Sequence, residues 1–180
     1  SPEDFYVGQD VAELFGITKW EPAISYWKGE GDVETPHPLF HKYTDIENFG
    51  NFPTAFMEGE QVVITEKIHG TNCRMGIIKT GDSWELMAGS RNCRKKRVDD
   101  FGRVPLYWQF LSKDIEEFLF WAADFMDYTE PVFSVILFGE IFGSGIQDMQ
   151  YGVEDWEKRL RVFDISINGS YVDYSRFTAL

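Results

Sequence analysis

Residues 66–72 of the chain, E-K-I-H-G-T-N, place a lysine, a histidine, a glycine and an asparagine close together, directly after the apolar run Val62-Val63-Ile64. A lysine amine can act as a nucleophile, and a glycine lets the backbone pass close to a ligand. The same cluster could be an ordinary polar turn. The remainder of the sequence must therefore decide between a reactive loop and a turn.

Further residues that could bind a ligand or take part in a reaction lie near the ends of predicted strands. We expect Lys67 to close one strand, Arg91 to close another, and Glu140 to follow a third, whereas Phe163 and Asp164 lie within R-V-F-D-I. Strand ends of one sheet can converge on a single crevice. An aromatic ring for a base, a carboxylate for ribose hydroxyls and cations for phosphates would together suit a nucleotide.

The elements that position these residues follow from hydrophobic periodicity and turn signals. We predict strands at about 61–67, 72–78 and 84–90, which form a meander, and further strands at about 132–138 and 159–167. Apolar residues at spacings of three and four predict a helix from about Tyr107 to Met126, and Ser175 opens a further short one. The expected fold class is α+β, with mainly antiparallel twisted sheets and packed helices.

The N-terminal part has a different character. Residues 8–16 resemble a short helix with Asp10 as N-cap and Gly16 as the stop. The proline-containing stretch up to residue 53 resembles a linker or a wrapping loop. We therefore divide the chain into a junction segment, residues 1–53, which we expect to pack loosely, and a domain, residues 54–180.

Composition limits the classes of function. With 43% hydrophobic and 17% aromatic residues in 180, the chain can bury a core and disorder is disfavoured. No apolar run approaches the roughly 18–20 residues of a membrane span, and no leader pattern opens the chain, so we expect no membrane partner and a cytoplasmic or otherwise intracellular protein. Cys73 and Cys93 are expected to be reduced.

A net charge of −13 argues against non-specific nucleic-acid binding, which needs a basic surface. Any such role would need a local strip, and residues 90–97, S-R-N-C-R-K-K-R, supply one. The more ordinary interpretation of this strip is a solvated loop.

Four motifs in order resemble those of the covalent nucleotidyltransferases, the superfamily of DNA ligases, RNA ligases and capping enzymes. They are K-I-H-G-T-N from Lys67, G-S-R-N at 89–92, F-G-E-I-F-G at 138–143 and V-F-D-I at 162–165. The histidine variant followed by T-N is similar to ATP-dependent RNA-repair ligases. Each motif alone is weak, but four in order are a specific signal.

The resemblance implies a nucleotidyltransferase (ATP-grasp-like ligase) adenylylation domain, with ATP as AMP donor and Mg²⁺ or Mn²⁺. Lys67 would be the catalytic nucleophile that becomes adenylylated. The AMP would then pass to a 5′-phosphate RNA end, and a 3′-hydroxyl would displace it to seal the strand. RNA ends and ATP are thus the expected partners; nothing indicates an oligomeric state.

The resemblance also implies roles for the other site residues. Glu140 would engage the ribose or metal-bound water, Phe163 would stack on adenine with Asp164 as its partner, and Arg91 would meet a phosphate. The remaining expected nucleotide contacts come from the nucleophile loop itself: Glu66, His69, Gly70 and Asn72. Alternatives stay open, because Phe163 could belong to the core and Asp164 could make a structural hydrogen bond.

Three parts of the family pattern are not found in these residues. No E-G-x-x or K-x-K motif follows Phe163. Residues 8–22, G-Q-D-V-A-E-L-F-G-I-T-K-W-E-P, resemble the junction between an N-terminal OB module and the ligase domain in the subfamily that carries one, and the resemblance places that module before Tyr6, outside the given residues. We therefore expect a fragment whose own activity is weak or lacking. A capping-type guanylyltransferase that uses GTP, or a non-catalytic module that binds nucleotides or RNA ends, are the alternative functions.

Overall fold

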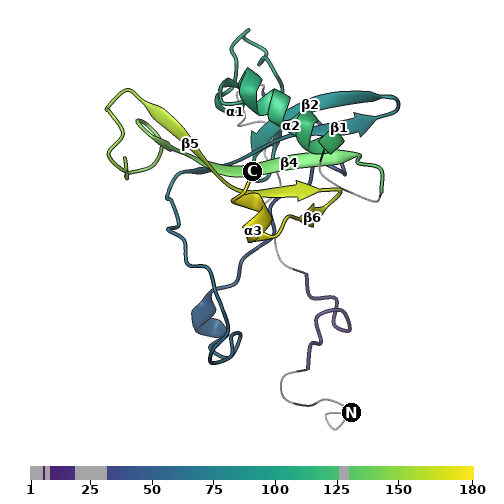
Figure 1. The fold of residues 1–180 in the computed structure, drawn as a ribbon, viewed down its shortest axis with the longest axis vertical. Coiled ribbons are helices and arrows are strands. Elements are labelled where there is room, and N and C mark those ends of the chain that lie inside the picture. Colours follow the sequence, from purple (N-terminus) through teal and green to yellow (C-terminus); the bar gives the residue numbers. More distant parts are fainter. Residues whose placement is uncertain (1–5, 7–8, 19–31, 126–129) are drawn as a thin grey trace.

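The computed structural model describes residues 6, 9–18, 32–125 and 130–180. In this part of the chain, six strands form one antiparallel sheet in the order β3-β2-β1-β4-β5-β6 (Figure 1). The strands are β1 Thr71–Thr80, β2 Ser83–Ser90, β3 Arg94–Lys95, β4 Ser134–Gly143, β5 Lys158–Ile167 and β6 Ser170–Tyr171. The helices are η2 Phe49–Asn51, a 3₁₀ turn, α1 Leu106–Gln109, α2 Lys113–Phe125 and α3 Tyr174–Phe177. The predicted α+β class with a mainly antiparallel sheet is confirmed.

Alternation along the strands gives the sheet two different faces. On one, which we call the helix face, inward side chains of β1, β4 and β5 pack against Leu119 and Ala122 of α2. The strand residues of this cluster are Ile77, Val135, Leu137, Ile165 and Ile167. Figure 1 shows α1 and α2 together on one side of the strands. The helices therefore leave the other face for a different cover.

That other cover is a strap, residues 39–45, and we call the face beneath it the strap face. Phe40 of the strap is 2% exposed and packs in one cluster with Ile78, Met87, Ile136 and Phe138. The buried Arg74 donates a hydrogen bond of 2.6 Å from Nη1 to the Phe40 carbonyl oxygen. The expectation that the first 50 residues pack loosely is therefore wrong for the strap, because one buried aromatic and one buried arginine fix it to the sheet.

A β-bulge changes which residues of β5 face the strap. Asp164 pairs with Phe138 but Val162 pairs with Gly139, so Phe163 has no Cα partner on β4. A bulge inserts one extra residue and reverses the alternation beyond it. Ile165 and Ile167 lie on the helix face, and beyond the bulge Val162 takes that face. Phe163 is thereby left outside the core, 37% exposed.

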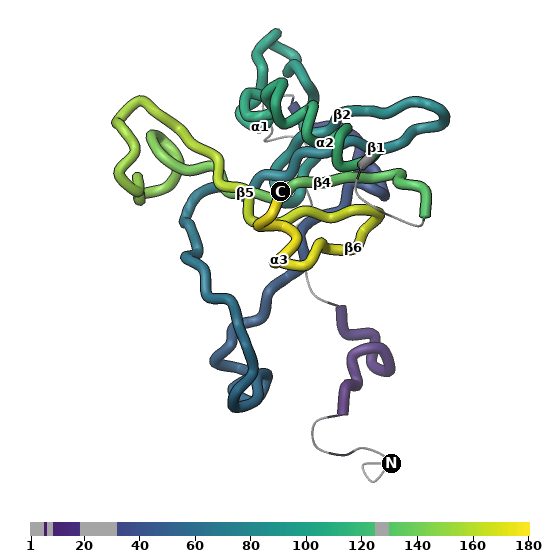
Figure 2. The backbone as a smooth tube through the Cα atoms, in the orientation of Figure 1, coloured from purple at the N-terminus to yellow at the C-terminus, as the bar shows by residue number. Residues whose placement is uncertain are grey.

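The predicted strand at 61–67 is wrong. Residues 61–69 carry no strand pairing, and Val62, Val63 and Ile64 are 50%, 57% and 91% exposed. Figure 2 shows the chain between the strap and β1 running away from the sheet and back. The segment lies beside β5 at a cavity but pairs with no strand in the described part of the chain, so the β propensity of its apolar run is not satisfied by pairing. The meander is therefore formed by β1, β2 and the short β3, one strand later in the chain than expected.

Two helix predictions also need correction. The helix expected from Tyr107 to Met126 is divided into α1 and α2, because the Ser112 side chain accepts a hydrogen bond from the Ile115 nitrogen at 3.3 Å and starts a new helix. Its expected end at Met126 lies outside the described residues. The N-terminal helix is only a turn at residues 12–16, although Asp10 caps it through the Ala12 nitrogen; positions 7 and 8 are not among the described residues.

No helix within the described ranges is long and apolar enough to cross a membrane.

Candidate functional site

The nucleophile loop is joined to β4 by a side-chain carboxylate. The backbone nitrogen of Gly70 donates a hydrogen bond of 3.1 Å to Oε1 of Glu140. A Cβ atom on Gly70 would lie 2.2 Å from the carbonyl oxygen of Ile141. Only glycine lets the loop approach β4 this closely, so Gly70 fixes where the residues just before it can lie.

Asn72 strengthens the same junction from β1. It stands opposite Glu140 in the β1–β4 register, and its side chain hydrogen-bonds to the Glu140 carboxylate. The Asn72 Oδ1 atom is buried and accepts no hydrogen bond from the described residues. Such a buried acceptor is costly unless a ligand, ion or water satisfies it. Asn72 and Glu140 therefore present oxygen atoms that a ligand or cation could use.

The pKa of Glu140 reflects both its burial and the basic residues near it. Burial raises the pKa of the Glu140 carboxyl above its ordinary value, and this outweighs four opposing effects. Those effects are the Gly70 hydrogen bond, the charge of Lys67, the Asn72 hydrogen bond and the charge of His69. Lys67 and His69 thus lie close enough to Glu140 for their charges to act on it.

The expectation that Lys67 closes a strand is wrong. Lys67 is exposed, and it lies in the extended segment that precedes β1. A second contact anchors this segment, because the backbone nitrogen of His69 donates a 2.6 Å hydrogen bond to the Tyr151 hydroxyl. Tyr151 also packs edge-on against Phe142 of β4, with ring centroids 5.6 Å apart. Sequence reasoning missed Tyr151, which lies in the β4–β5 loop and carries no motif.

Glu140 also differs from its expected position, since it lies within β4 and not after it. The strand continues through F-G-E-I-F-G to Gly143. Its alternation places Glu140 on the strap face together with Ile136 and Phe138. Asn72, two residues before Arg74 on β1, lies on that face too. The junction and the strap thus occupy the same side of the sheet.

A cavity of about 510 Å³ on this side brings three of the predicted residues together: Glu66, Phe163 and Asp164. Their neighbours in its lining are Tyr43, Val63, Thr65, Ile68, Arg161, Val162, Tyr174 and Phe177. The side chain of Lys67 is not among them, although both residues that flank it in the chain are. Arg161 of the lining stands opposite Glu140 in the β4–β5 register. The cavity therefore lies one strand away from the junction at Glu140.

The exposed ring of Phe163 and the carboxylate of Asp164 are both held by the strap. The Tyr43 hydroxyl donates a hydrogen bond of 2.9 Å to Asp164 Oδ2, and the Ile165 nitrogen donates one of 2.8 Å to Oδ1. The Tyr43 ring packs edge-on against Phe163, with centroids 5.1 Å apart and an interplanar angle of 83°. Tyr43 was missed in the sequence, because nothing in H-K-Y-T-D predicts a contact with a strand more than a hundred residues later.

Arg91 lies apart from the cavity. It follows β2, whose end adjoins the start of β1, and its guanidinium forms an ion pair with Asp45 of the strap. The rest of the basic strip is likewise engaged by carboxylates or an aromatic ring. The contacts are Arg94 with Glu34 and Glu85, Lys95 with Asp32, Lys96 with Asp100, and Arg97 over the ring of Trp108. The charge of the strip is therefore largely neutralised, but the strip is not simply a solvated loop, because Arg94 and Lys95 form β3 and their side chains are mostly buried.

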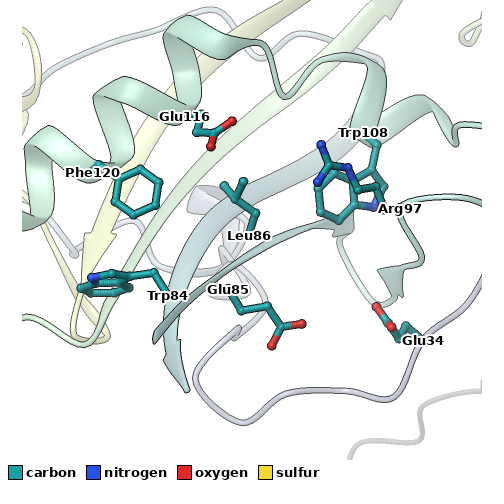
Figure 3. A pocket seen from close by; sticks show the side chains of 8 residues that line it. All are labelled: Glu34, Trp84, Glu85, Leu86, Arg97, Trp108, Glu116 and Phe120. Atoms are coloured by element: carbon teal, nitrogen blue, oxygen red, sulfur yellow. The ribbon is translucent and has the colours of Figure 1, made fainter. Parts of the chain in front are cut away.

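A separate cavity of about 450 Å³ lies between α1, α2 and β2 (Figure 3). Figure 3 shows Trp84, Leu86 and Phe120 on one part of its wall and Arg97 against Trp108 on another. None of the predicted site residues lines it. The candidate site is therefore the strap-face cavity together with the junction at Glu140.

The arrangement combines a lysine, a carboxylate near it, and an exposed aromatic ring at a cavity. No cluster of three or more histidine, cysteine, aspartate or glutamate residues suited to a metal occurs among the described residues. A cation here would instead be held by Glu140, the Asn72 amide oxygen and ligand oxygens. Hard divalent cations such as Mg²⁺ accept this kind of sparse oxygen set.

Comparison with known proteins agrees with these features. The sequence profile of a family described as RNA ligase matches residues 60–180. A search of curated protein sequences found no match. The matched range includes the nucleophile loop, the junction at Glu140 and all residues of β5.

Solved structures of Naegleria gruberi RNA ligase are similar to the whole chain. A variant with AMP and Mn is 26% identical, with a TM-score of 0.64, over 99% of this chain and 49% of that one. A second variant, with ATP and Mn, is 25% identical, with a TM-score of 0.61, over 99% and 49%. A third structure, with PPi, is 24% identical, with a TM-score of 0.64, over 98% and 48%, and shows likeness of fold alone. The chain thus spans about half the length of these structures.

Proposed function

Because the chain belongs to the RNA ligase family, we propose that it carries the adenylylation site of an ATP-dependent RNA ligase. The substrates would be ATP and RNA ends with a 5′-phosphate and a 3′-hydroxyl. In this proposal residues 1–53 are a junction segment that follows an OB module, and residues 54–180 are part of the adenylylation domain. Within the first part, residues 39–45 pack on the sheet of the second.

One observation carries the proposal. The loop that bears Lys67 is held against Glu140 through Gly70, and the exposed ring of Phe163 contacts Tyr43 of the strap, which covers the face of the sheet that carries Glu140. A nucleophile, a carboxylate and a ring for stacking are what transfer of a nucleotide to a lysine requires. The AMP- and ATP-bound states of the Naegleria variants support the choice of an adenine nucleotide.

The proposed reaction is attack of Lys67 Nζ on the α-phosphorus of ATP. A lysine attacks only as the free amine, so its ammonium proton must leave first, and neighbouring cations favour that loss. A nitrogen–phosphorus bond forms while the bond from the α-phosphorus to the pyrophosphate oxygen breaks, and pyrophosphate departs with the electron pair. AMP then remains on Lys67 as a phosphoramidate, ready for transfer to an RNA 5′-phosphate.

Glu140 and Asn72 fit a divalent cation, on the evidence of the buried acceptor at Asn72 Oδ1. Mg²⁺ keeps several waters and takes one or two carboxylates together with substrate phosphates. We propose that Glu140 holds Mg²⁺ or Mn²⁺, directly or through water. A bound divalent cation would offset negative charge on the triphosphate.

The other residues bind and orient the nucleotide in this proposal. Phe163 stacks on adenine, and Asp164 and Glu66 border the base in the same cavity. His69 lies near Glu140 in the same loop. Arg91 reaches a phosphate of ATP or of the RNA end after exchanging its carboxylate partner Asp45 for phosphate oxygens, which a guanidinium fork binds well.

The test is formation of the covalent adduct. The chain is incubated with ATP or GTP labelled at the α-phosphate, with Mg²⁺ or Mn²⁺, and the adduct is detected on a denaturing gel and by mass. Lys67→Ala is compared with Lys79→Ala, which removes an exposed lysine from the opposite end of β1. We expect an AMP adduct in the unmodified chain and in Lys79→Ala, and none in Lys67→Ala.

Each alternative gives a different result. Label from GTP but not from ATP would indicate a guanylyltransferase. Nucleotide binding with no adduct after prolonged incubation at saturating ATP would indicate a non-catalytic module. An adduct that survives Lys67→Ala would exclude Lys67 as the nucleophile.

A further inference from the structure

The strap, residues 39–45, is anchored at both of its ends. At one end Phe40 is buried, with the Arg74 guanidinium 4.5 Å from its ring centroid. At the other end Asp45 forms an ion pair with Arg91. The strap is thus anchored before and after Tyr43, which fixes the position of this tyrosine.

Tyr43 lies at the centre of a group of aromatic rings. Its ring centroid is 5.1 Å from that of Phe138, 5.1 Å from that of Tyr171 and 5.1 Å from that of Phe163. Phe138 is fully buried in β4, whereas Phe163 is exposed at the cavity. The tyrosine therefore connects a buried ring of the core to an exposed ring at the cavity.

The bulge makes this support necessary. Phe163 has no partner on β4 and does not belong to the helix-face core. An exposed aromatic ring without a support would sample several rotamers, and a ring that stacks on a base must hold one plane. The edge-on contact from Tyr43 restricts the ring, since edge-to-face aromatic pairs have preferred geometry.

The hydroxyl of Tyr43 contacts Asp164, the residue that follows Phe163. It donates to Asp164 Oδ2, so the aspartate is held from the strap as well as from its own backbone. Burial, and then the hydrogen bond to Asp164, raise the pKa of the Tyr43 hydroxyl. The tyrosine consequently stays protonated and remains a donor at neutral pH.

We propose that Tyr43 is a positioning residue for nucleobase binding, which holds the Phe163 ring and the Asp164 carboxylate in place at the cavity. This inference rests on the proposed function, because it concerns the same nucleotide. It adds that a residue outside the family motifs, from the segment before the domain, completes the base pocket. Loss of a purely structural tyrosine would affect folding, but it would not weaken binding of the base while leaving binding of the phosphates unchanged.

The experiment measures equilibrium binding of ATP and of inorganic tripolyphosphate, which has the phosphates but no base. Tyr43→Leu removes both the edge-on contact and the hydroxyl, and Tyr43→Phe removes only the hydroxyl. Thr44→Val is the matched control, because it breaks the Thr44–Tyr171 side-chain contact of 3.0 Å in the same strap without touching Phe163 or Asp164. Thermal unfolding of each variant is recorded in parallel.

We expect Tyr43→Leu to weaken ATP binding about 3- to 10-fold, and to leave tripolyphosphate binding unchanged. Tyr43→Phe, which keeps the ring contact, should lie between Tyr43→Leu and the unmodified chain. Thr44→Val should bind both ligands normally. If Tyr43→Leu does not fold, Tyr43→Phe carries the test: a loss for ATP alone supports the proposal, and no loss overturns it.

Phe163→Ala separates this inference from the proposed function. Weaker ATP binding in Phe163→Ala together with normal binding in Tyr43→Leu would overturn the role of Tyr43 and leave the proposed function standing. Equal losses for ATP and tripolyphosphate in Tyr43→Leu would show a structural role only, and would also overturn the inference. Failure of the unmodified chain to bind ATP would reject the proposed function, and this inference with it.

Discussion

The Gly70 backbone nitrogen and the Glu140 carboxylate are 3.1 Å apart, and this hydrogen bond closes the nucleophile loop onto β4. The contact links a residue of the loop to a residue of another motif on a neighbouring strand. The hydrogen bond holds the backbone three residues after Lys67, and so it restricts where Lys67 can lie. The first predictions therefore concern these two residues.

Gly70→Ala should displace the loop. The added Cβ would lie 2.2 Å from the Ile141 carbonyl oxygen, a backbone atom that cannot move aside easily. A displacement of about 1 Å can cost a reaction about 100-fold in rate, so we expect a loss of adduct formation of that order. The loop is exposed, and the melting temperature should change little. The measurement is the rate of AMP labelling, with thermal unfolding alongside.

Gly81→Ala is the control for this substitution. Gly81 lies in the β1–β2 turn with φ +62°, and no atom would lie within 4 Å of its Cβ. Alanine in this left-handed conformation costs about 1–2 kcal/mol of stability, but the turn is at the far end of β1. We expect a lower melting temperature with normal labelling. Normal labelling by Gly70→Ala as well would contradict the role given to the loop.

Glu140→Gln should change the pH dependence of stability. The pKa of Glu140 is raised in the folded protein, chiefly by burial, so the unfolded chain releases this proton first as the pH rises. The stability contributed by Glu140 is greatest below its unfolded pKa of about 4.3, and is lost as the pH rises through the folded pKa. Glutamine is neutral throughout and can still accept from Gly70. The variant should therefore gain in melting temperature relative to the unmodified chain between about pH 4 and pH 7.

The comparison is made in metal-free buffer, because a bound cation would stabilise the ionised carboxylate. Glu58→Gln, at an exposed position before the nucleophile loop, is the control and should show no pH-dependent difference. A difference between Glu140→Gln and the unmodified chain that is the same at both pH values would show that burial does not govern the titration of Glu140.

Phe163→Ala should weaken nucleotide binding by about 1–3 kcal/mol, the range for stacking of a base on an aromatic side chain. Its matched control is Phe133→Ala, since Phe133 is 39% exposed and Phe163 is 37% exposed, but Phe133 does not line the cavity. Titration of both variants with AMP gives the measurement. Unchanged affinity in Phe163→Ala would show that the Phe163 ring does not stack on the base.

The sequence indicated the order of the motifs and most strands correctly, because period-two alternation and turn residues are local signals. The hairpin of β1 and β2 around K-T-G-D-S is an example. The bulge at Phe163 could not be predicted, since it depends on how β5 aligns with β4. It disfavours the core interpretation of Phe163 left open by the sequence, because it leaves the ring 37% exposed, and stacking on a base stays a prediction.

The contacts of the strap were equally beyond sequence reasoning. Tyr43 and Asp164, or Asp45 and Arg91, are far apart in the chain, and no periodic pattern relates them. Proline and the sparse apolar residues correctly suggested an irregular segment, but not that a single buried phenylalanine would fix it. Long-range contacts of this kind come from tertiary packing, which local propensity does not encode.

The last prediction concerns the segment that was mistaken for a strand. Val62, Val63 and Ile64 have the composition of a strand, yet Ile64 is 91% exposed, whereas Ile136 in β4 is fully buried. Ile136→Ala should lower the free energy of unfolding by about 2–5 kcal/mol, as for other buried isoleucines. Ile64→Ala should change it by no more than about 0.5 kcal/mol, as for exposed sites. Urea unfolding of the two variants gives both changes in the free energy of unfolding, and the substitution is isoleucine to alanine in each. A comparable loss in Ile64→Ala would mean that residues 61–67 are packed after all, and the position of Lys67 relative to β1 would then have to be revised.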